Sequence, residues 1–242
     1  ADESFTGMQY APSPVSGVGD VNGDGFDDVV VGLPDFKTAS GYSGSAFLVL
    51  GSVRGMASMD VTHGGVEYAG EIAGDAAGSA VAGAGDINGD GFDDMLIGAS
   101  GYRYFERNYG AVYVLEGGES DPRDMSLAHA DATLLGEGKT DAVGDVLSSA
   151  GVVNGDGYDD LLIGAPKYQD NTGRVYLVYG SHMGVSDMHL ESADAKITGD
   201  YQEQRAGYSV SAAGDVNNDG FDDVMVGATN MYDGAAYVVT GS

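Results

Sequence analysis

Short apolar runs recur along the chain in four groups, and each group repeats the same order of hydrophobic and polar positions. One apolar run leads into a polar stretch rich in Asp, Asn and Gly, and a second run leaves that stretch and ends in Gly. A third run follows a Gly-containing turn, and a shorter, more polar fourth run ends three of the four groups. Runs of this length between turn residues predict β-strands rather than helices. We therefore expect one four-stranded antiparallel sheet from each group.

The predicted strands occupy equivalent places in successive groups. The first strands are Pro14–Gly19, Ser79–Gly85, Asp145–Gly151 and Tyr208–Gly214. The second strands are Val29–Gly32, Met95–Gly98, Leu161–Gly164 and Val224–Gly227. The third strands are Ala46–Leu50, Ala111–Leu115, Arg174–Tyr179 and Ala235–Val239. The fourth strands, expected at the outer edge of each sheet, are Val66–Gly70, Ala132–Gly136 and Ala195–Gly199.

The polar stretch between the first and second strands is the most regular part of the sequence. Its copies are Asp20–Asp28 (DVNGDGFDD), Asp86–Asp94 (DINGDGFDD), Val152–Asp160 (VVNGDGYDD) and Asp215–Asp223 (DVNNDGFDD), and their first positions lie 66, 66 and 63 residues apart. So regular a period indicates one supersecondary unit used four times. We expect a single domain over residues 1–242, with repeats at about 8–70, 71–136, 137–199 and 200–242, the last completed by residues 1–7.

Each polar stretch has the composition of a calcium loop. Side-chain oxygens fall at positions 1, 3, 5 and 9, the backbone carbonyl of position 7 adds another, and Gly at position 6 permits a sharp turn. A flexible, carboxylate-rich, all-oxygen set favours Ca²⁺ over Mg²⁺, and the absence of Cys and of nearby His argues against zinc or iron. The predicted ligands are Asp20, Asn22, Asp24, Phe26 and Asp28; Asp86, Asn88, Asp90, Phe92 and Asp94; Asn154, Asp156, Tyr158 and Asp160; and Asp215, Asn217, Asp219, Phe221 and Asp223.

The third loop departs from this pattern because Val152 stands at position 1. Losing one carboxylate weakens the site, so we expect three strong calcium sites and a fourth, at Val152–Asp160, that is weak or empty. The alternative is that Asp-Gly and Asn-Gly only make tight hairpin turns. Four copies with carboxylates at fixed offsets favour the metal.

These motifs resemble a known repeat. The loop begins like an EF-hand but lacks the Glu at position 12 and the flanking helices. GAGDINGDGFDD, followed by apolar residues and then Gly98-Ala99-Ser100 or Gly164-Ala165-Pro166, resembles the FG-GAP repeat of integrin alpha-subunit propellers and many bacterial secreted proteins. The resemblance covers essentially the whole chain and implies β-propeller blades with calcium between the first two strands. The departures are Val152, an approximate Phe-Gly portion, and four repeats where integrin-type propellers have seven blades.

We therefore expect an all-β fold, a β-propeller of four four-stranded antiparallel blades. The last group lacks its outer strand, and Glu3–Gly7 has the character to supply it, which would close the ring by strand exchange and leave few free edges. The rival arrangement is a half-ring that pairs with a second copy, a homodimer with eight blades.

Composition limits the partners. The formal net charge of −28 argues against nucleic acid and anionic membranes as partners. The sequence contains no run of 18 apolar residues, so we expect no membrane insertion. The absence of Cys excludes disulfides without fixing the compartment. No secretion signal heads the chain, whose start is typical of a processed or trimmed protein. Because weak calcium loops fill only where calcium is millimolar, we expect a secreted or cell-surface protein.

A ligand-binding face is predicted opposite the calcium loops. The loops after the second strands and the crossovers hold six of the ten Lys and Arg residues, and an aromatic follows each second strand at Phe36, Tyr102, Tyr168 and Tyr232. These aromatics either cap the blades or bind ligand, whereas the segment GYRYFERNYG, which we interpret as an insertion unique to the second repeat, favours binding. The predicted ligand-binding residues are Tyr102, Arg103, Tyr104, Arg107, Tyr168 and Tyr232.

Together these patterns predict a calcium-stabilised extracellular adhesion module that binds carbohydrate or a protein partner and is not an enzyme. No nucleophile motif or phosphate loop is present, and we expect His63, His129, His182 and His189 on the calcium-side periphery. Two alternatives stay open: a secreted, lyase-like polysaccharide-active enzyme, and a structural module that assembles with its own copies.

Overall fold

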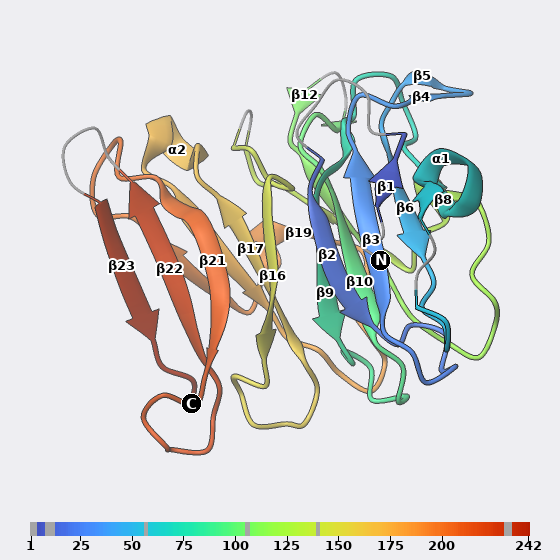
Figure 1. Ribbon diagram of the computed structural model, residues 1–242. Helices are drawn as coiled ribbons and strands as arrows, with labels where there is room; N and C mark the ends of the chain where they lie inside the picture. The colour runs from blue at the N-terminus through green and yellow to red at the C-terminus, as the bar shows by residue number, and fades with distance from the viewer. Residues whose placement is uncertain (1–3, 8–12, 56–57, 105–106, 139–140, 230–233) are drawn as a thin grey trace.

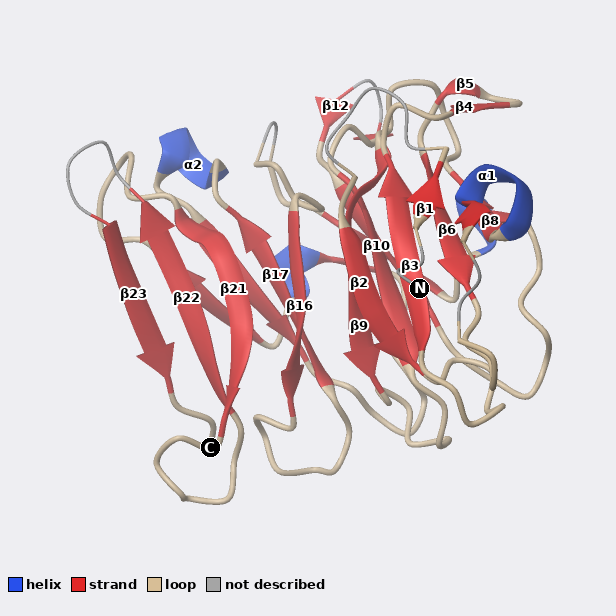
Figure 2. Cartoon of the chain, in the orientation of Figure 1, coloured by secondary structure: helices blue, strands red, loops and turns tan. Residues whose placement is uncertain are grey.

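The computed structural model describes residues 4–7, 13–55, 58–104, 107–138, 141–229 and 234–242. Within these ranges the chain is built mainly from β-strands, and its helices are single turns (Figure 2). They are the α-helices α1 (Val61–Gly64) and α2 (Tyr168–Asn171) and the 3₁₀-helices η1 (Leu127–His129) and η2 (Leu190–Ser192). No helix in this described part is long and apolar enough to cross a membrane. The predicted all-β class is confirmed.

Four antiparallel sheets stand side by side, one for each sequence repeat, and we number them blades 1 to 4 (Figure 1). Blade 1 contains β2 (Val15–Gly19), β3 (Asp28–Leu33), β6 (Ser45–Val49) and β8 (Val66–Ala69). Blade 2 contains β9 (Ala77–Gly85), β10 (Asp94–Ala99), β13 (Ala111–Leu115) and β15 (Ala132–Leu135). Blade 3 contains β16 (Val146–Gly151), β17 (Asp160–Ala165), β18 (Arg174–Val178) and β20 (Ala195–Thr198). Blade 4 contains β21 (Ala206–Gly214), β22 (Asp223–Thr229) and β23 (Gly234–Val239).

The first strand of every blade ends in a bulge that opens into the Asp-rich loop. The pairing register shifts by one residue just before the loop in all four blades. The last strand residue is Gly19, Gly85, Gly151 or Gly214, with φ between 67° and 74°. A side chain is disfavoured in this left-handed conformation, so glycine fixes the point at which pairing stops and the loop begins.

Short strands that pair in parallel connect neighbouring blades. β14 (Met125–Ser126) pairs with the outer strand β8 of blade 1, and β19 (Met188–His189) pairs with the outer strand β15 of blade 2. Each short strand continues into η1 or η2 and then into the outer strand of its own blade. The connection between the third and fourth strands of each of these blades is thereby held against the outer strand of the preceding blade.

The amino-terminal strand forms the same kind of parallel pair and does not complete blade 4. β1 (Phe5–Thr6) pairs in parallel with β7 (Met59–Asp60), which is the blade 1 counterpart of β14 and β19. β1 therefore takes the place that the outer strand of a preceding blade would occupy. Among the described residues blade 4 has three strands, and β1 lies at the opposite end of the row of blades (Figure 1). The expected strand exchange, which would need the two ends to meet, is not seen in this structure.

Apolar side chains fill the spaces between blades. Tyr113, Tyr176, Phe47, Leu96 and Ile97 are among the largest fully buried side chains, and all lie on second or third strands. Burying one such side chain stabilises the fold by about 1.5–3 kcal/mol. The outer surface of blade 4 is different, because several of its apolar side chains are exposed: Tyr208, Met225, Tyr237 and Val238.

Two small hairpins and α2 stand at the end of the blades opposite the Asp-rich loops (Figure 1). β11 (Arg103–Tyr104) and β12 (Arg107–Asn108) form the hairpin of blade 2, and β4 (Lys37–Thr38) and β5 (Gly41–Tyr42) form one in blade 1. The interpretation of the blade 2 segment as a unique insertion is therefore wrong. Blade 1 builds the same kind of hairpin from a different sequence.

Candidate metal loops and the opposite loop face

The four Asp-rich loops lie together at one end of the blades and share one internal anchor, the aspartate at position 9. Asp28, Asp94, Asp160 and Asp223 are each 0% exposed. One oxygen of each accepts a hydrogen bond from the backbone N–H of position 2, at 2.9–3.2 Å. The other accepts from the glycine N–H just after the third strand, at 2.7–2.9 Å. This side chain therefore ties the loop to the third strand of its own blade.

The side chains at positions 1, 3 and 5 curl around the loop backbone. In the first loop the two carboxylate oxygens of Asp20 accept from the N–H groups of Asp24 and Gly25, at 3.0 and 2.8 Å. Asn22 Oδ1 accepts from Asp24 N, and Asp24 Oδ1 accepts from Phe26 N. The second and fourth loops repeat these bonds with their own residues. In the third loop, Val152 offers no side-chain acceptor, and only the bonds of Asn154 and Asp156 remain.

Negative charge accumulates in these loops without a cationic side chain to offset it. Burial raises the pKa of Asp28, with smaller contributions from the neighbouring charges of Asp24 and Asp20. Burial likewise raises the pKa of Asp94 to about 7 and that of Asp160 to about 6. No ion pair found within the described ranges involves a predicted loop ligand. A bound divalent cation would relieve this repulsion.

The donor set fits a hard cation, but the side chains are not gathered around one point. In the part of the chain that the structure describes, no three acidic or histidine side chains form a group that could hold a metal ion. The carboxylates of positions 1 and 5 are instead turned onto the loop N–H groups. The carboxylates of position 5 are exposed, whereas those of position 1 are half-buried in the first and second loops and exposed in the fourth.

The aspartate at position 8, which the sequence analysis left without a role, links neighbouring loops. Asp93 of blade 2 accepts a hydrogen bond from Asp20 N of blade 1, at 2.9 Å. Asp159 accepts in the same way from Asp86 N, and Asp222 from Val152 N, both at 2.9 Å. The signal was present in the sequence as an Asp-Asp doublet at positions 8 and 9 of all four loops. In the second, third and fourth loops its first member reaches back to the preceding blade, and in all four loops its second member bonds within its own blade.

The repeated aromatics at the opposite end pack mainly into the blades. Phe36 contacts Phe47 edge-to-face at 5.2 Å between ring centroids, and Tyr102 contacts Tyr113 in the same way at 6.2 Å. Tyr168 is 6% exposed and is covered by the Arg174 guanidinium, 3.8 Å from its ring centroid. These contacts are those of blade caps. Tyr232, the fourth member, lies outside the described residues.

The blade 2 hairpin presents a more open group of side chains. Arg103 and Tyr104 are exposed. The Tyr104 ring lies edge-on to Tyr109 and to His189, at 6.4 and 6.1 Å between centroids. Arg107 contributes to β12, but its side chain is outside the described part of the structure. The expectation that His189 lies on the calcium side is wrong, because β19 runs along the outer strand of blade 2 and carries His189 to this hairpin.

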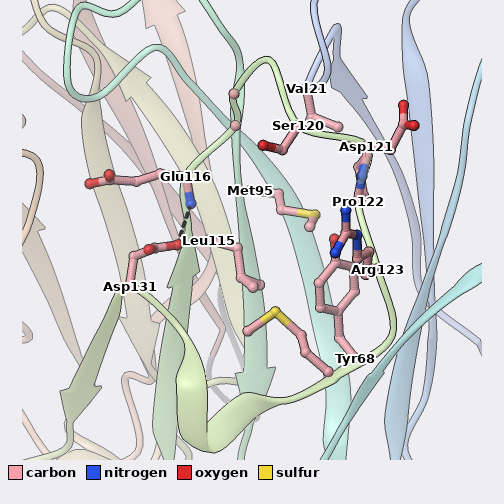
Figure 3. A pocket seen from close by; sticks show the side chains of 13 residues that line it. Val21, Tyr68, Met95, Leu115, Glu116, Ser120, Asp121, Pro122, Arg123 and Asp131 are labelled. Atoms are coloured by element: carbon pink, nitrogen blue, oxygen red, sulfur yellow. Dashed lines mark hydrogen bonds between the residues drawn. The ribbon is translucent and has the colours of Figure 1, made fainter.

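A cavity that the sequence gave no reason to expect opens between blades 1 and 2, beside Val21 of the first loop (Figure 3). Its volume is about 480 Å³. Its floor is formed by Val21, Tyr68, Met95 and Leu115, each at most 5% exposed, and Arg123 also lines it. An apolar floor with a cation at the rim is a typical binding pocket.

The loop after β13, which lines this cavity, lacks a turn present in blade 3. There, Ser181 Oγ donates to Gly184 O, Gly184 N donates to Ser181 O, and the following Val185 is buried in the core. The corresponding blade 2 residues are Gly118, Asp121 and Pro122. Without the hydroxyl and the second glycine, no such turn bond forms among the described residues, and Pro122, the counterpart of Val185, lines the cavity.

The repeats and loops define the class of protein. The model of the FG-GAP repeat family matches residues 15–49, 77–115, 149–178 and 206–239, which together are more than half of the chain. Each match runs from the first strand, through the Asp-rich loop, to the third strand. The chain belongs to the FG-GAP repeat family, and its β-propeller blade architecture is that of the family.

Integrin alpha subunits are among the relatives of this chain. The chain is 30% identical over 234 residues to integrin alpha pat-2 of Caenorhabditis briggsae, covering 91% of this chain and 18% of that protein. It is 29% identical over 237 residues to integrin alpha-PS2 of Drosophila melanogaster, covering 94% of this chain and 15% of that protein. It is also 35% identical over 156 residues to integrin alpha-3 of Cricetulus griseus, covering 62% and 14%. The chain thus spans less than a fifth of these relatives' lengths, and like them it is extracellular, secreted or at the cell surface.

Proposed function

We propose that this chain is a calcium-stabilised adhesion module that binds carbohydrate or a protein partner through the loops opposite its Asp-rich loops. The observation that carries the proposal is the separation of two chemistries at the two ends of the blades. The Asp-rich loops lie at one end of the blades, and the hairpin that carries exposed Arg103 and Tyr104 lies at the other (Figure 1). Membership of a family that includes integrin alpha subunits supports an adhesive role.

Calcium has a structural role in this proposal. The residues that would hold it are the side chains at positions 1, 3, 5 and 9 and the carbonyl at position 7 of the first, second and fourth loops. When bound, the ion would neutralise carboxylates that otherwise repel one another. Position 9 already anchors each loop to a third strand, so ordering the loop would stiffen the end of the whole blade.

Carbohydrate or protein recognition would use the blade 2 hairpin. Arg103 supplies a planar cation, while Tyr104, Tyr109 and His189 supply ring surfaces at one place. Aromatic faces beside a guanidinium suit sugar rings, acidic polysaccharide or a protein hot spot. Tyr102 and Tyr168 would act from beneath, by holding the loops that carry these exposed groups.

The proposal is tested by applying the calcium-loaded protein to a glycan and polysaccharide array beside the Arg103→Ala/Tyr104→Ala variant. We expect binding that the double substitution abolishes, and a substantially lower melting temperature in EDTA. An unchanged melt in EDTA would refute the structural role of calcium. Absence of binding to every sugar would exclude the carbohydrate branch and direct the search to protein ligands, or to assembly of the module with its own copies.

One observation favours a second candidate, a polysaccharide-active enzyme. His189 lies beside Tyr104 on the hairpin that also carries Arg103, so this end of blade 2 combines the Tyr, Arg and His found in the clefts of such enzymes. We nevertheless place binding first, because the named relatives are integrin alpha subunits. Release of products absorbing in the ultraviolet from acidic polysaccharides would favour the enzyme.

A further inference from the structure

The same three hydrogen bonds join each blade to the next at the end where the Asp-rich loops lie. The backbone N–H of position 1 donates to the position 8 carboxylate of the next blade, at 2.9 Å. The position 1 carbonyl accepts from the N–H of that aspartate, at 3.1–3.2 Å. The position 2 carbonyl accepts from the third residue after the next blade's third strand, at 2.9–3.0 Å. Every junction between blades therefore has two different and complementary halves.

Blade 4 presents the first half of such a junction uncovered. Asp215 N, Asp215 O and Val216 O make no hydrogen bond with the residues that the structure describes. The apolar side chains beside them are exposed, with values of 58% for Val216, 41% for Met225 and 54% for Val238. Their blade 2 counterparts, which pack against blade 3, are each 0% exposed: Ile87, Leu96 and Val114. This face of blade 4 therefore has the form of a surface that another blade covers.

Blade 1 presents the second half at the other end of the row. Asp27, its position 8 aspartate, is exposed, and neither its carboxylate nor its N–H bonds to another described residue. Ser52 N, the counterpart of Gly118 N, likewise has no partner in the described part of the chain. Val15 on β2 is 61% exposed, whereas its blade 2 counterpart Val81 is 8% exposed. Blade 1 is therefore open beside β2, where a preceding blade would pack.

The strand edges at these two ends match each other in register. The outer strand β8 pairs in antiparallel with β6 of its own blade and in parallel with β14 of the next. β1 makes only the parallel pair, with β7, and among the described residues β23 has no outer strand. Placing β1 as β8 is placed would set Phe5 opposite Ala236 and Thr6 opposite Ala235, in antiparallel. β1 can therefore complete a blade 4 without giving up its pair with β7.

Within one copy the two halves lie at opposite ends of the row of blades, so a second copy is the partner that offers both (Figure 1). We infer that blade 4 of each copy packs against blade 1 of a second copy, and that β1 of that copy becomes the fourth strand of blade 4. Two such contacts close a ring of eight blades, a number that known propellers reach. The inference goes beyond the proposed ligand binding and does not depend on it, because the blade 2 hairpin lies outside both end blades.

One residue makes the contact between copies weaker than the junctions within a copy. The first three loops have glycine at position 4, whereas blade 4 has Asn218 there. Its exposed side chain must turn aside when Phe26 of the second copy, which is 38% exposed, approaches. We therefore expect Asn218→Gly to tighten the association of the two copies.

Sedimentation equilibrium of the calcium-loaded protein over a range of concentrations tests the inference. We expect a species of twice the 24.7 kDa mass of one chain. Asp27→Ala removes an acceptor that bonds to no other described residue of its own copy, so it should weaken the dimer at least about tenfold. Val238→Glu, which puts a charge into the apolar contact, should abolish the dimer. The control Asp121→Ala removes an equally exposed aspartate of blade 2 and should leave the dimer unchanged.

Engineered cysteines identify the strands that meet, because the chain has no Cys of its own. Thr6→Cys and Ala235→Cys proteins, mixed and oxidised, should form a disulfide that joins the two variants, since both positions are exposed and directly opposite in the expected pairing. Met183→Cys in place of Ala235→Cys is the control. Met183 is 77% exposed but lies in blade 3, so this mixture should not cross-link.

Three results would overturn the inference. The first is a monomer at every concentration, and the second is a dimer that Asp27→Ala and Val238→Glu leave intact, because such a dimer uses another surface. The third comes from Thr6→Cys and Ala235→Cys combined in one chain. A disulfide within that single chain would show that four blades close by themselves, whereas a covalent dimer supports the contact between copies.

Discussion

The aspartates of the Asp-rich loops have different structural roles because their surroundings differ. At position 9 the carboxylate is fully buried and accepts two backbone N–H groups, whereas at position 8 it reaches the preceding blade. At positions 1 and 5 it stays near solvent and curls over its own loop. Removing a buried acceptor leaves N–H donors unpaired, at a cost of about 1–3 kcal/mol each. Position 9 is therefore needed for folding whether or not calcium is bound.

Burial also makes single aspartates sensitive to pH, and Asp75, remote from the Asp-rich loops, isolates the effect from calcium. It is 1% exposed, and burial raises its pKa to about 6. The pKa of an aspartate in an unfolded chain is about 3.9, so the folded protein binds the Asp75 proton more tightly than the unfolded chain does. The contribution of Asp75 to stability therefore falls as the pH rises from about 4 to about 6 and then stays constant.

Asp75→Asn removes this titration. We expect the free energy of unfolding of the variant, relative to wild type, to increase by about 2–3 kcal/mol between pH 4 and pH 7. Urea unfolding in EDTA at several pH values measures the difference and keeps calcium out of the comparison. A difference that is independent of pH would show that Asp75 does not titrate in this range.

At the scale of elements, each junction between blades packs an aromatic of one loop over a glycine of the preceding loop. A Cβ atom on Gly23, Gly89 or Gly155 would lie 2.4–2.6 Å from the ring of Phe92, Tyr158 or Phe221 of the next blade. These glycines have φ between 71° and 74°, so glycine is favoured for its backbone as well as for its lack of a side chain.

A matched pair of glycines in the second loop separates these two reasons. Gly89 and Gly91 both have positive φ, but a Cβ on Gly91 meets nothing within 4 Å. We expect Gly91→Ala to lower the free energy of unfolding by about 1 kcal/mol, the cost of the left-handed backbone, and Gly89→Ala by about 2–3 kcal/mol because it also displaces Tyr158. Chemical unfolding of both variants tests this; equal losses would mean that the junction tolerates a methyl group.

Much of this element structure could be predicted from the sequence because each strand and loop depends on residues that are close together in the chain. The strands and loops follow from short apolar runs and fixed Asp and Gly positions, and the structure reproduces their order in every blade. Contacts between repeats were beyond that reasoning. Three such contacts join segments that are distant in sequence. They are the pairing of β1 with β7, the contact between His189 and Tyr104, and the hydrogen bond from Arg174 to Glu137. Pattern alone does not say which distant segments meet.

Across the whole molecule, the Asp-rich loops and the hairpins lie at opposite ends of the blades. The formal net charge is −28, and the Asp-rich loops concentrate carboxylates at the end opposite α2 and the hairpins. Three calcium ions would offset six of these charges at the place where they are densest. Ion binding would therefore reduce the self-repulsion of the whole chain as well as order single loops.

The number of strong sites is the quantity that tests this picture. Val152→Asp restores the missing carboxylate of the third loop, and it leaves the Val152 N–H bond to Asp222 intact because that bond is made by the backbone. We expect isothermal titration calorimetry to give three strong calcium sites in wild type and in a Val152→Ala control, and four in Val152→Asp. Four equivalent sites in wild type would contradict the assignment of the third loop as weak.

The junctions between blades also give the row of blades a direction. One side offers the N–H of position 1 and a glycine at position 4, and the other offers the carboxylate of position 8 and the aromatic of position 7. Such a contact between two different surfaces is heterologous, as in head-to-tail assemblies. In blade 4 the glycine is replaced by Asn218, with φ of 60°, so an aromatic arriving in the usual place would meet a side chain. The four repeats are therefore not interchangeable: blade 4 could not be shuffled into an internal position without reshaping the junction that follows it.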